Sequence, residues 1–332
     1  MKKTVIILIA ALILLSFCGC SGNAGTGSEP APTANGNSST PGSENSPTAA
    51  PENTNNAENS PAATSEAETS PAEDPTAAPE QVAGSDKLEV TEKIDYVIIC
   101  GRGECADSEI VIPSHINGKP VTRIDEDAFR GDSLTSIAFP WTVTSIGEDA
   151  FIECPNLASV TFSEGLTGIS TSAFRSCPSL KSVAFPASLE RVGNYAFRQC
   201  EGLEEVIFLG GTTLGNSIFE DCVALRKVTF GKGVYGYSIG SSCFSRCAAL
   251  ETVVFDEGLS DIGSWALSSC GAIDTLVLPK SLSGVGACAF QFAAVKEVYY
   301  GGSEEDWKNV TVKNSNESLL EATFTYNYGY NS

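Results

Sequence analysis

The chain has 332 residues and a formal net charge of −21, with 41 acidic residues, 20 basic residues and a single histidine. The charge divides into +2 from Lys2 and Lys3, −9 from residues 21–85 and −14 from residues 86–332. So acidic a protein has little electrostatic attraction for nucleic acid or for anionic lipid, which argues against both as partners.

Residues 1–20 have the composition of a secretory signal peptide. Lys2 and Lys3 precede an apolar run that ends in "FCGCSGN", and this run is too short for a permanent membrane span. The ending resembles the lipobox of bacterial lipoproteins, and Cys20 after Gly19 fits it better than Cys18 after Phe17. The resemblance implies a lipid attachment site at Cys20, and a diacyl anchor would hold the protein at a membrane durably. A plain cleaved signal peptide is the alternative.

Residues 21–85 have the composition of a disordered segment. They contain no aromatic residue and no Lys or Arg, and Val82 is their only large aliphatic residue. Such a segment cannot bury enough apolar surface to offset the entropy of ordering. We therefore expect an acidic, extended tether between the signal peptide and a folded domain at residues 86–332.

The folded domain is a run of repeats, as in "IGEDAFIECPNLASVTF", "ISTSAFRSCPSLKSVAF" and "VGNYAFRQCEGLEEVIF". The column that defines them is Phe129, Phe151, Phe174, Phe197, Phe219, Phe244, Leu267 and Phe290, at intervals of 22 to 25 residues. Four further apolar columns hold the same register: an Ile or Val five residues earlier, then the positions of "LxxVxF". A fixed period of this length predicts a solenoid of stacked coils.

Each coil is expected to contain a short strand, a turn and a short helical or 3-10 segment around "EDAF". In "LxxVxF" the Val and Phe should point inward, and the strands of successive coils should pair in parallel. A glycine follows the Ile/Val column in six coils and indicates a tight turn. The prediction is therefore an α/β solenoid of about eight coils with a parallel β-ladder.

The repeat pattern resembles the bacterial BspA-like leucine-rich repeat, also called the treponemal type. The resemblance covers roughly residues 95–325, including "EIVIPSHINGKPVTRIDEDAF" (109–129) and "VYYGGSEEDWKNV" (298–310) at its two ends. It implies an N-terminal cap at 86–120, repeats at 121–300 and a C-terminal cap at 301–332. Caps are also expected physically, because an open solenoid end exposes core and unpaired strand edge. Ser303 and Asp306 could form a capping box that places Trp307 over the last coil.

Six cysteines lie three residues after the Phe column: Cys154, Cys177, Cys200, Cys222, Cys247 and Cys270. They recur once per coil, so they should form a row of buried free thiols rather than a metal site or disulfides. Cys100 and Cys105 lie close together in "CGRGEC", and the sequence is compatible both with a disulfide between them and with two free thiols. The pattern assigns no position to Cys243 and Cys288.

No catalytic, cofactor or metal motif is present. His115 has no acidic or nucleophilic partner in its surrounding sequence. "FGKGVYG" lacks the P-loop spacing, and "GRGECA" and "GVGACA" lack a third glycine and a βαβ context. We therefore expect no enzyme, no cofactor and no metal.

The outward positions of the strand ladder are the candidate binding surface, since solenoids bind through exposed faces. The predicted partner-binding residues are Ile207, Val254, Val277, Glu297 and Tyr299. The second outward column becomes apolar towards the C-terminus, with Val254, Val277 and Tyr299 on adjacent coils. Ordinary β-propensity is the alternative explanation of these residues. Trp141, outside the ladder, is a further candidate contact.

Some members of the BspA-like family bind extracellular-matrix proteins. The resemblance therefore implies a lipid-anchored, extracytoplasmic bacterial surface protein that adheres to an unidentified host-matrix or envelope protein. We expect a monomer that touches the membrane only through its anchor and does not bind nucleic acid. The alternatives are a passive spacer of the cell envelope and a lipoprotein that captures glycans or other solutes.

Overall fold

The computed structural model describes residues 84–231 and 237–329. The signal peptide with Cys20 and nearly all of the predicted tether lie outside the described residues. Within the described ranges, no helix combines the length and the apolar composition that crossing a bilayer requires.

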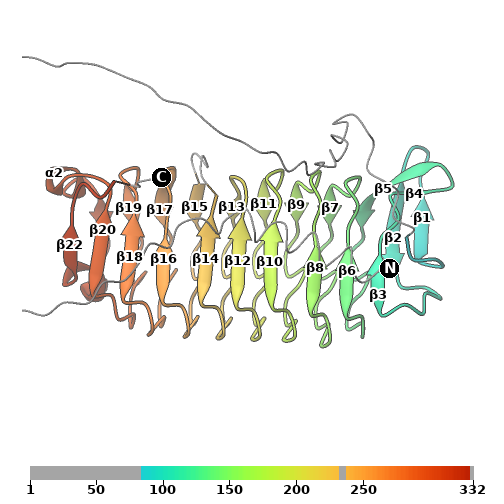
Figure 1. Ribbon diagram of the computed structural model, residues 1–332, viewed down its shortest axis with the longest axis horizontal. Helices are drawn as coiled ribbons and strands as arrows, with labels where there is room; N and C mark the ends of the chain where they lie inside the picture. The colour runs from blue at the N-terminus through green and yellow to red at the C-terminus, as the bar shows by residue number, and fades with distance from the viewer. Residues whose placement is uncertain (1–83, 232–236, 330–332) are drawn as a thin grey trace, which may run out of the picture. The chain divides into compact units, whose positions relative to one another are not determined.

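The "LxxVxF" segments, one from each coil, form a parallel ladder of two hydrogen-bonded sheets, one of three strands followed by one of seven (Figure 1). Its strands are β3 (Glu109–Val111), β6 (Ser136–Ala138), β8 (Ser159–Thr161), β10 (Ser182–Phe185), β12 (Glu205–Phe208), β14 (Lys227–Phe230), β16 (Thr252–Val254), β18 (Thr275–Leu278), β20 (Glu297–Tyr300) and β22 (Thr323–Thr325). Equivalent residues pair directly, as Val183 with Val206 and Phe185 with Phe208. This in-register parallel pairing confirms the predicted ladder.

A second parallel ladder contains the Ile/Val column, and it too consists of two hydrogen-bonded sheets, one ending at Leu214 and the other beginning at Tyr237. Its strands are β2 (Val97–Gly101), β5 (Lys119–Ile124), β7 (Ser145–Ile146), β9 (Gly168–Ile169), β11 (Arg191–Val192), β13 (Thr213–Leu214), β15 (Tyr237–Ile239), β17 (Leu259–Ile262), β19 (Gly284–Val285) and β21 (Thr311–Val312). The stretch 232–236, directly before β15, lies outside the described residues. Both ladders turn their apolar residues into one continuous core.

The Phe column forms a stack of rings along this core. Phe129 lies 5.0 Å from Phe151, and Phe151 lies 4.9 Å from Phe174, with nearly parallel planes. The strand phenylalanines meet the stack edge-on, as Phe139 does against Phe151 at 5.8 Å. Parallel-offset and edge-to-face contacts are the favoured geometries of aromatic pairs, so like side chains stabilise the stacking of successive coils.

The segments around "EDAF" are turns and not the short helical pieces that the sequence predicted. Residues two positions before the Phe column and two positions after it adopt positive φ in every coil, as Asp149 (53°) and Glu153 (59°) do around Phe151. Two left-handed residues four positions apart interrupt any α- or 3-10 helix. Alternate amides of these turns donate to the next coil instead, as Asp149 does to Thr171.

The glycines after the Ile/Val column are required for a different reason from the one the sequence suggested. None of them has a positive φ. A Cβ at Gly147 would lie 2.6 Å from the carbonyl carbon of Asp125 in the preceding coil, and one at Gly263 would lie 2.6 Å from the amide of Ser241. The absence of a side chain therefore lets adjacent backbones approach closely.

The two end segments extend the ladders, which gives about 10 turns in place of the eight counted from the repeats. At the N-terminus, β1 (Glu89–Glu92) pairs antiparallel with β2, and β4 (His115–Ile116) pairs antiparallel with β5. At the C-terminus, α2 (Glu304–Trp307), β21, α3 (Glu317–Leu320) and β22 follow one another. The helices α2 and α3 are the only ones in the described ranges.

The predicted capping box is confirmed. Ser303 accepts the backbone N–H of Asp306, and the Asp306 carboxylate accepts the N–H of Ser303. Trp307 packs against Tyr300 at 5.1 Å and Phe324 at 4.8 Å between ring centroids. It therefore covers the last coils, as expected.

Candidate functional site

The candidate surface is the outer face of the first ladder, where residues alternate between core and solvent. Direct register places Val254 of β16 beside Val277 of β18, and Val277 beside Tyr299 of β20. The three side chains form a continuous apolar row across three coils. The structure thus brings together the C-terminal members of the predicted site.

The members of this row differ in exposure. Val254 is 39% exposed and Tyr299 is half-buried, but Val277 is only 7% exposed. The expectation that Val277 is an exposed contact is therefore wrong; Val277 lies in a central strand, with Val254 on one side and Tyr299 on the other. Val277 is the buried centre of the apolar row, and Val254 and Tyr299 on either side of it are accessible to a partner.

Tyr299 is part of a small polar and aromatic group. Its hydroxyl donates to the Glu297 carboxylate at 2.9 Å, and its ring lies 5.0 Å from that of Tyr328. The carboxylate accepts this hydrogen bond and disfavours a phenolate, so it raises the pKa of Tyr299. No sequence pattern indicated Tyr328, which follows β22 and contacts β20 through a hydrogen bond from its backbone N–H to the Tyr300 carbonyl.

Ile207 lies apart from this row. It is half-buried on β12, and its partner in the next strand is Thr229 of β14, which separates it from β16. Beside it, Lys227 pairs with Glu205 at 2.9 Å. The structure therefore does not join Ile207 to the other predicted contacts.

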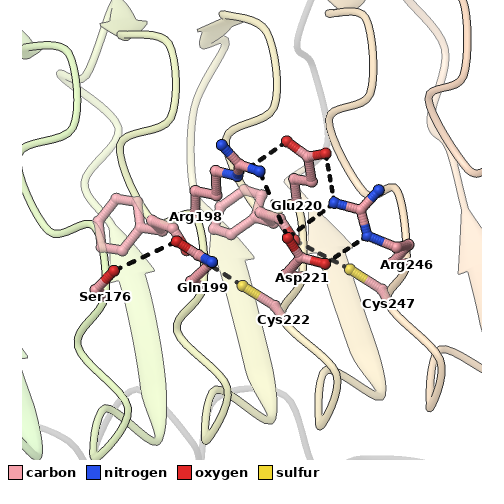
Figure 2. A network of polar contacts seen from close by, with 10 residues as sticks. Ser176, Arg198, Gln199, Glu220, Asp221, Cys222, Arg246 and Cys247 are labelled. Atoms are coloured by element: carbon pink, nitrogen blue, oxygen red, sulfur yellow. Dashed lines mark hydrogen bonds and ion pairs between the residues drawn. The ribbon is translucent and has the colours of Figure 1, made fainter.

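Charged side chains form a second group on the turns that follow the Phe column (Figure 2). Arg246 binds Asp221 and Glu220, with 2.7 Å to the Glu220 carboxylate. Arg198 reaches the same two acids from the other side at 3.1 and 3.7 Å. Two arginines from separate coils thus sandwich the acids of the coil between them, and the hydrogen bonds and charge of Arg246 lower the pKa of Asp221. The sequence did not indicate this group, because its two turn columns carry different residue types from coil to coil.

The comparisons agree with this architecture. The profile of the family described as "BspA type Leucine rich repeat region" matches residues 122–236 and 212–329. The chain belongs to this family. The repeat columns and both ladders are therefore family features of a BspA-type leucine-rich repeat.

Solved structures of leucine-rich repeat proteins resemble the chain. One from Bacteroides ovatus is 26% identical with a TM-score of 0.56, over 66% of this chain and 58% of that one. This chain thus spans 58% of the length of the Bacteroides protein. Another from T. pallidum is 26% identical with a TM-score of 0.46, over 62% of this chain and 86% of that one. No curated protein sequence matches.

The repeat cysteines of this BspA-type chain form the predicted row of buried free thiols. Each thiol donates to the carbonyl of the Phe in the preceding coil, at 3.0 to 3.2 Å. Burial raises the pKa of the Cys270 thiol to about 12. The Cys270 thiol is therefore protonated at neutral pH and acts as a hydrogen-bond donor, and a thiol in this state is a poor nucleophile.

The four other cysteines in the described part of the chain are also free. Cys100 and Cys105 are not bridged, and the Cys100 thiol donates to Thr91 at 3.2 Å. Cys243 takes the position of an alanine in the repeat, directly before the Phe column, and Cys288 takes one of the left-handed turn positions.

Other candidate residues stand alone. Trp141 is 56% exposed, with the exposed His115 ring 6.4 Å away. His115 contacts only the Ser114 hydroxyl, at 3.2 Å, among its described polar neighbours. In residues 84–231 and 237–329, no group of three or more His, Cys, Asp and Glu side chains could hold a metal ion.

Proposed function

We propose that the protein is an extracytoplasmic bacterial surface protein, lipid-anchored through Cys20, whose solenoid adheres to a protein of the host matrix or of the cell envelope. The binding is non-covalent, and the protein is not an enzyme. Membership of the BspA-type leucine-rich repeat family supports the role in protein binding, since solenoids present extended surfaces to their partners. The signal sequence with its lipobox and the acidic tether support surface display.

The observation that carries the proposal is the apolar row Val254–Val277–Tyr299, on a ladder face whose outward column otherwise carries small or polar residues apart from Ile207. In the N-terminal half, the same outward column reads Ala138, Thr161 and Ala184. Small and polar residues there show that the strand fold does not itself require large apolar side chains outside. Apolar surface on the C-terminal coils is therefore available for a partner.

The test is capture of matrix and envelope proteins by the chain from Ser21 onwards, followed by mass spectrometry. The Val254→Asp/Tyr299→Asp variant should lose the captured protein, because charges in the row oppose burial under a partner. Thr161→Asp, in the same column of β8, is the matched control and should retain it. Equal capture by all three proteins would contradict the proposed surface.

The membrane anchor requires its own test. Cys20→Ala should abolish metabolic labelling with a radioactive fatty acid and release the protein into the medium. Labelling that persists in this variant would place the anchor elsewhere.

Glycan binding is a second candidate, favoured by the contact of Tyr299 with Glu297 and Tyr328. Aromatic faces pack against the C–H faces of sugar rings, and a neighbouring carboxylate accepts hydroxyl protons. Glu297→Gln and Tyr328→Ala should then reduce glycan binding on an array. A chain that retains neither protein nor glycan would support the role of passive spacer.

A further inference from the structure

The two ends of the solenoid are finished differently. At the N-terminal end, β1 covers the second ladder by antiparallel pairing with β2. Ser85 covers the first ladder, because its N–H donates to the Val111 carbonyl at 2.7 Å and its hydroxyl accepts the Val111 N–H. The N-terminal end of each ladder is therefore covered, the second by β1 and the first by the backbone at Ser85.

At the C-terminal end both ladders stop at a strand with one neighbour. Among the described residues, β22 pairs only with β20, and β21 pairs only with β19. Figure 1 shows β22 as the outermost strand of its ladder. Such an edge is a template for pairing with another chain.

The hydrogen bonds of β22 show which groups face outward. Thr323 donates to the Lys296 carbonyl at 2.8 Å, so its backbone polar groups face β20. In a parallel strand, alternate residues turn both backbone groups to opposite sides. The N–H and C=O of Phe324 therefore point away from β20. The chain beyond bends back, since Asn327 has a φ of 57° and Tyr328 bonds to the Tyr300 carbonyl.

The side chains at this end are apolar and incompletely covered. Phe324, Trp307, Tyr326 and Val312 pack on the core but are only half-buried, and Leu320 is 55% exposed. The residues that pair with Phe324 and Val312 in the preceding strands, Val298 and Val285, are almost completely buried. This end therefore exposes apolar area that a further layer would cover.

We propose that this end is a dimer interface, in which β22 pairs antiparallel with β22 of a second copy about a two-fold axis centred on Phe324. Phe324 then exchanges both of its outward backbone hydrogen bonds with Phe324 of the partner subunit. Thr323 lies opposite Thr325 of the partner subunit, which is a favourable cross-strand pair. The strand carries no charged side chain, so no like charges meet across the axis.

A second copy joined end to like end fits better than a head-to-tail contact. The N-terminal end presents β1, whose Glu89 and Glu92 are exposed carboxylates. In a head-to-tail stack these carboxylates would lie against β21, the last strand of the same ladder, and would bury charge on its half-buried Val312. The matching apolar surface is the same end of another copy, and such a contact closes as a dimer. The sequence alone led us to expect a monomer, because it does not show this edge.

The test is the mass of the chain from Ser21 onwards, measured by light scattering over a range of concentrations. The unmodified chain should reach twice the mass of one chain. Thr323→Lys/Thr325→Lys should be monomeric, because each lysine then faces a lysine across the axis. Thr252→Lys, at the equivalent outward position of β16, is the matched control and should stay dimeric.

A charge-reversed variant tests whether the lysine variant is monomeric because of charge repulsion or because it is misfolded. Thr323→Glu/Thr325→Glu should also be monomeric alone, whereas a 1:1 mixture with the lysine variant should restore the double mass. An unmodified chain that stays monomeric at every concentration would overturn the proposal. So would a lysine variant that remains dimeric, or a mixture of the two variants that stays monomeric.

Discussion

The thiol of Cys200 donates a hydrogen bond to the backbone carbonyl of Phe174, 26 positions earlier in the chain, at 3.2 Å. Both residues are completely buried. The turn after each Phe leaves the Phe carbonyl pointing into the core. A small side chain that carries a hydrogen-bond donor, such as the cysteine of the next coil, provides a partner for this carbonyl. This explains why cysteine and not alanine recurs in this column.

Removal of the donor should destabilise the solenoid. Cys200→Ala leaves the Phe174 carbonyl without its thiol partner and opens a small cavity, so the free energy of unfolding should fall by about 2 kcal/mol. Cys200→Ser keeps a donor and should lose less than half as much. The midpoint of urea unfolding measures both. If the serine variant is as unstable as the alanine variant, the hydrogen bond is not the reason for cysteine.

The apolar columns were predictable, because burial and period fix them. A residue such as Val206 has one inward direction in every coil, so its column reveals strand, register and parallel stacking together. Features that depend on backbone conformation were not predictable in this way. Tyr195 and Trp265, for example, adopt left-handed backbone conformations in the turns. A glycine or asparagine at these positions would have indicated that conformation, but a tyrosine or tryptophan does not. The exposure of Val277 was misjudged because neighbours on other coils decide it.

Relief of a left-handed position should stabilise the protein. Phe292 is 74% exposed and has a φ of 60°, which is unfavourable for a bulky residue. Phe292→Asn should raise the free energy of unfolding by about 1 kcal/mol, whereas Phe292→Val should lower it. Thermal unfolding distinguishes the two. Gln291→Asn, whose φ is not positive, is the control and should not raise the melting temperature.

The close approach of coils at the glycines can be tested with a single methyl group. Gly263→Ala forces a Cβ to 2.6 Å from the Ser241 amide, so the backbones must separate. The expected loss is about 2 kcal/mol, similar to other overpacked cores. Gly271→Ala, where nothing lies within 4 Å, should be neutral or slightly stabilising. Equal effects of the two changes on urea unfolding would contradict the role of close approach.

The charged group on the turns should make stability depend on pH. Asp221 has a pKa below its ordinary value of 3.8, first because Arg246 donates hydrogen bonds to it. The folded state thus favours the ionised carboxylate. Its contribution to stability is complete above pH 3.8 and is lost as the pH falls through the folded value.

Arg246→Met should therefore lower the free energy of unfolding by about 1 kcal/mol at neutral pH, since Asp221 and Glu220 lose a shared partner. The difference from the unmodified chain should shrink below pH 3.8. Chemical unfolding at several pH values measures it. Arg226→Met, which changes an exposed arginine outside this charged group, is the control. A deficit that stays constant into acid would exclude the pairing with Asp221 as its cause.

Two glutamates hold neighbouring coils together through the backbone. Glu257 accepts the N–H groups of Lys280 and Ser281 in the next coil, at 2.9 and 3.2 Å. Glu164 makes the same pair of contacts to Ala187 and Ser188, at 3.1 Å each. Both glutamates precede a glycine with positive φ, and the serine hydroxyl of the next coil accepts the N–H of that glycine.

Glu257→Gln should cost about 1 kcal/mol, because the amide nitrogen cannot accept the second N–H. Glu257→Ala should cost about 2 kcal/mol, and adding Glu164→Ala should double that loss, because separate coils contribute independently. Glu251→Gln, an exposed glutamate in the same coil as Glu257, is the control for charge alone and should have little effect. If urea unfolding shows the same loss for Glu251→Gln as for Glu257→Gln, net charge and not the contact between coils is responsible.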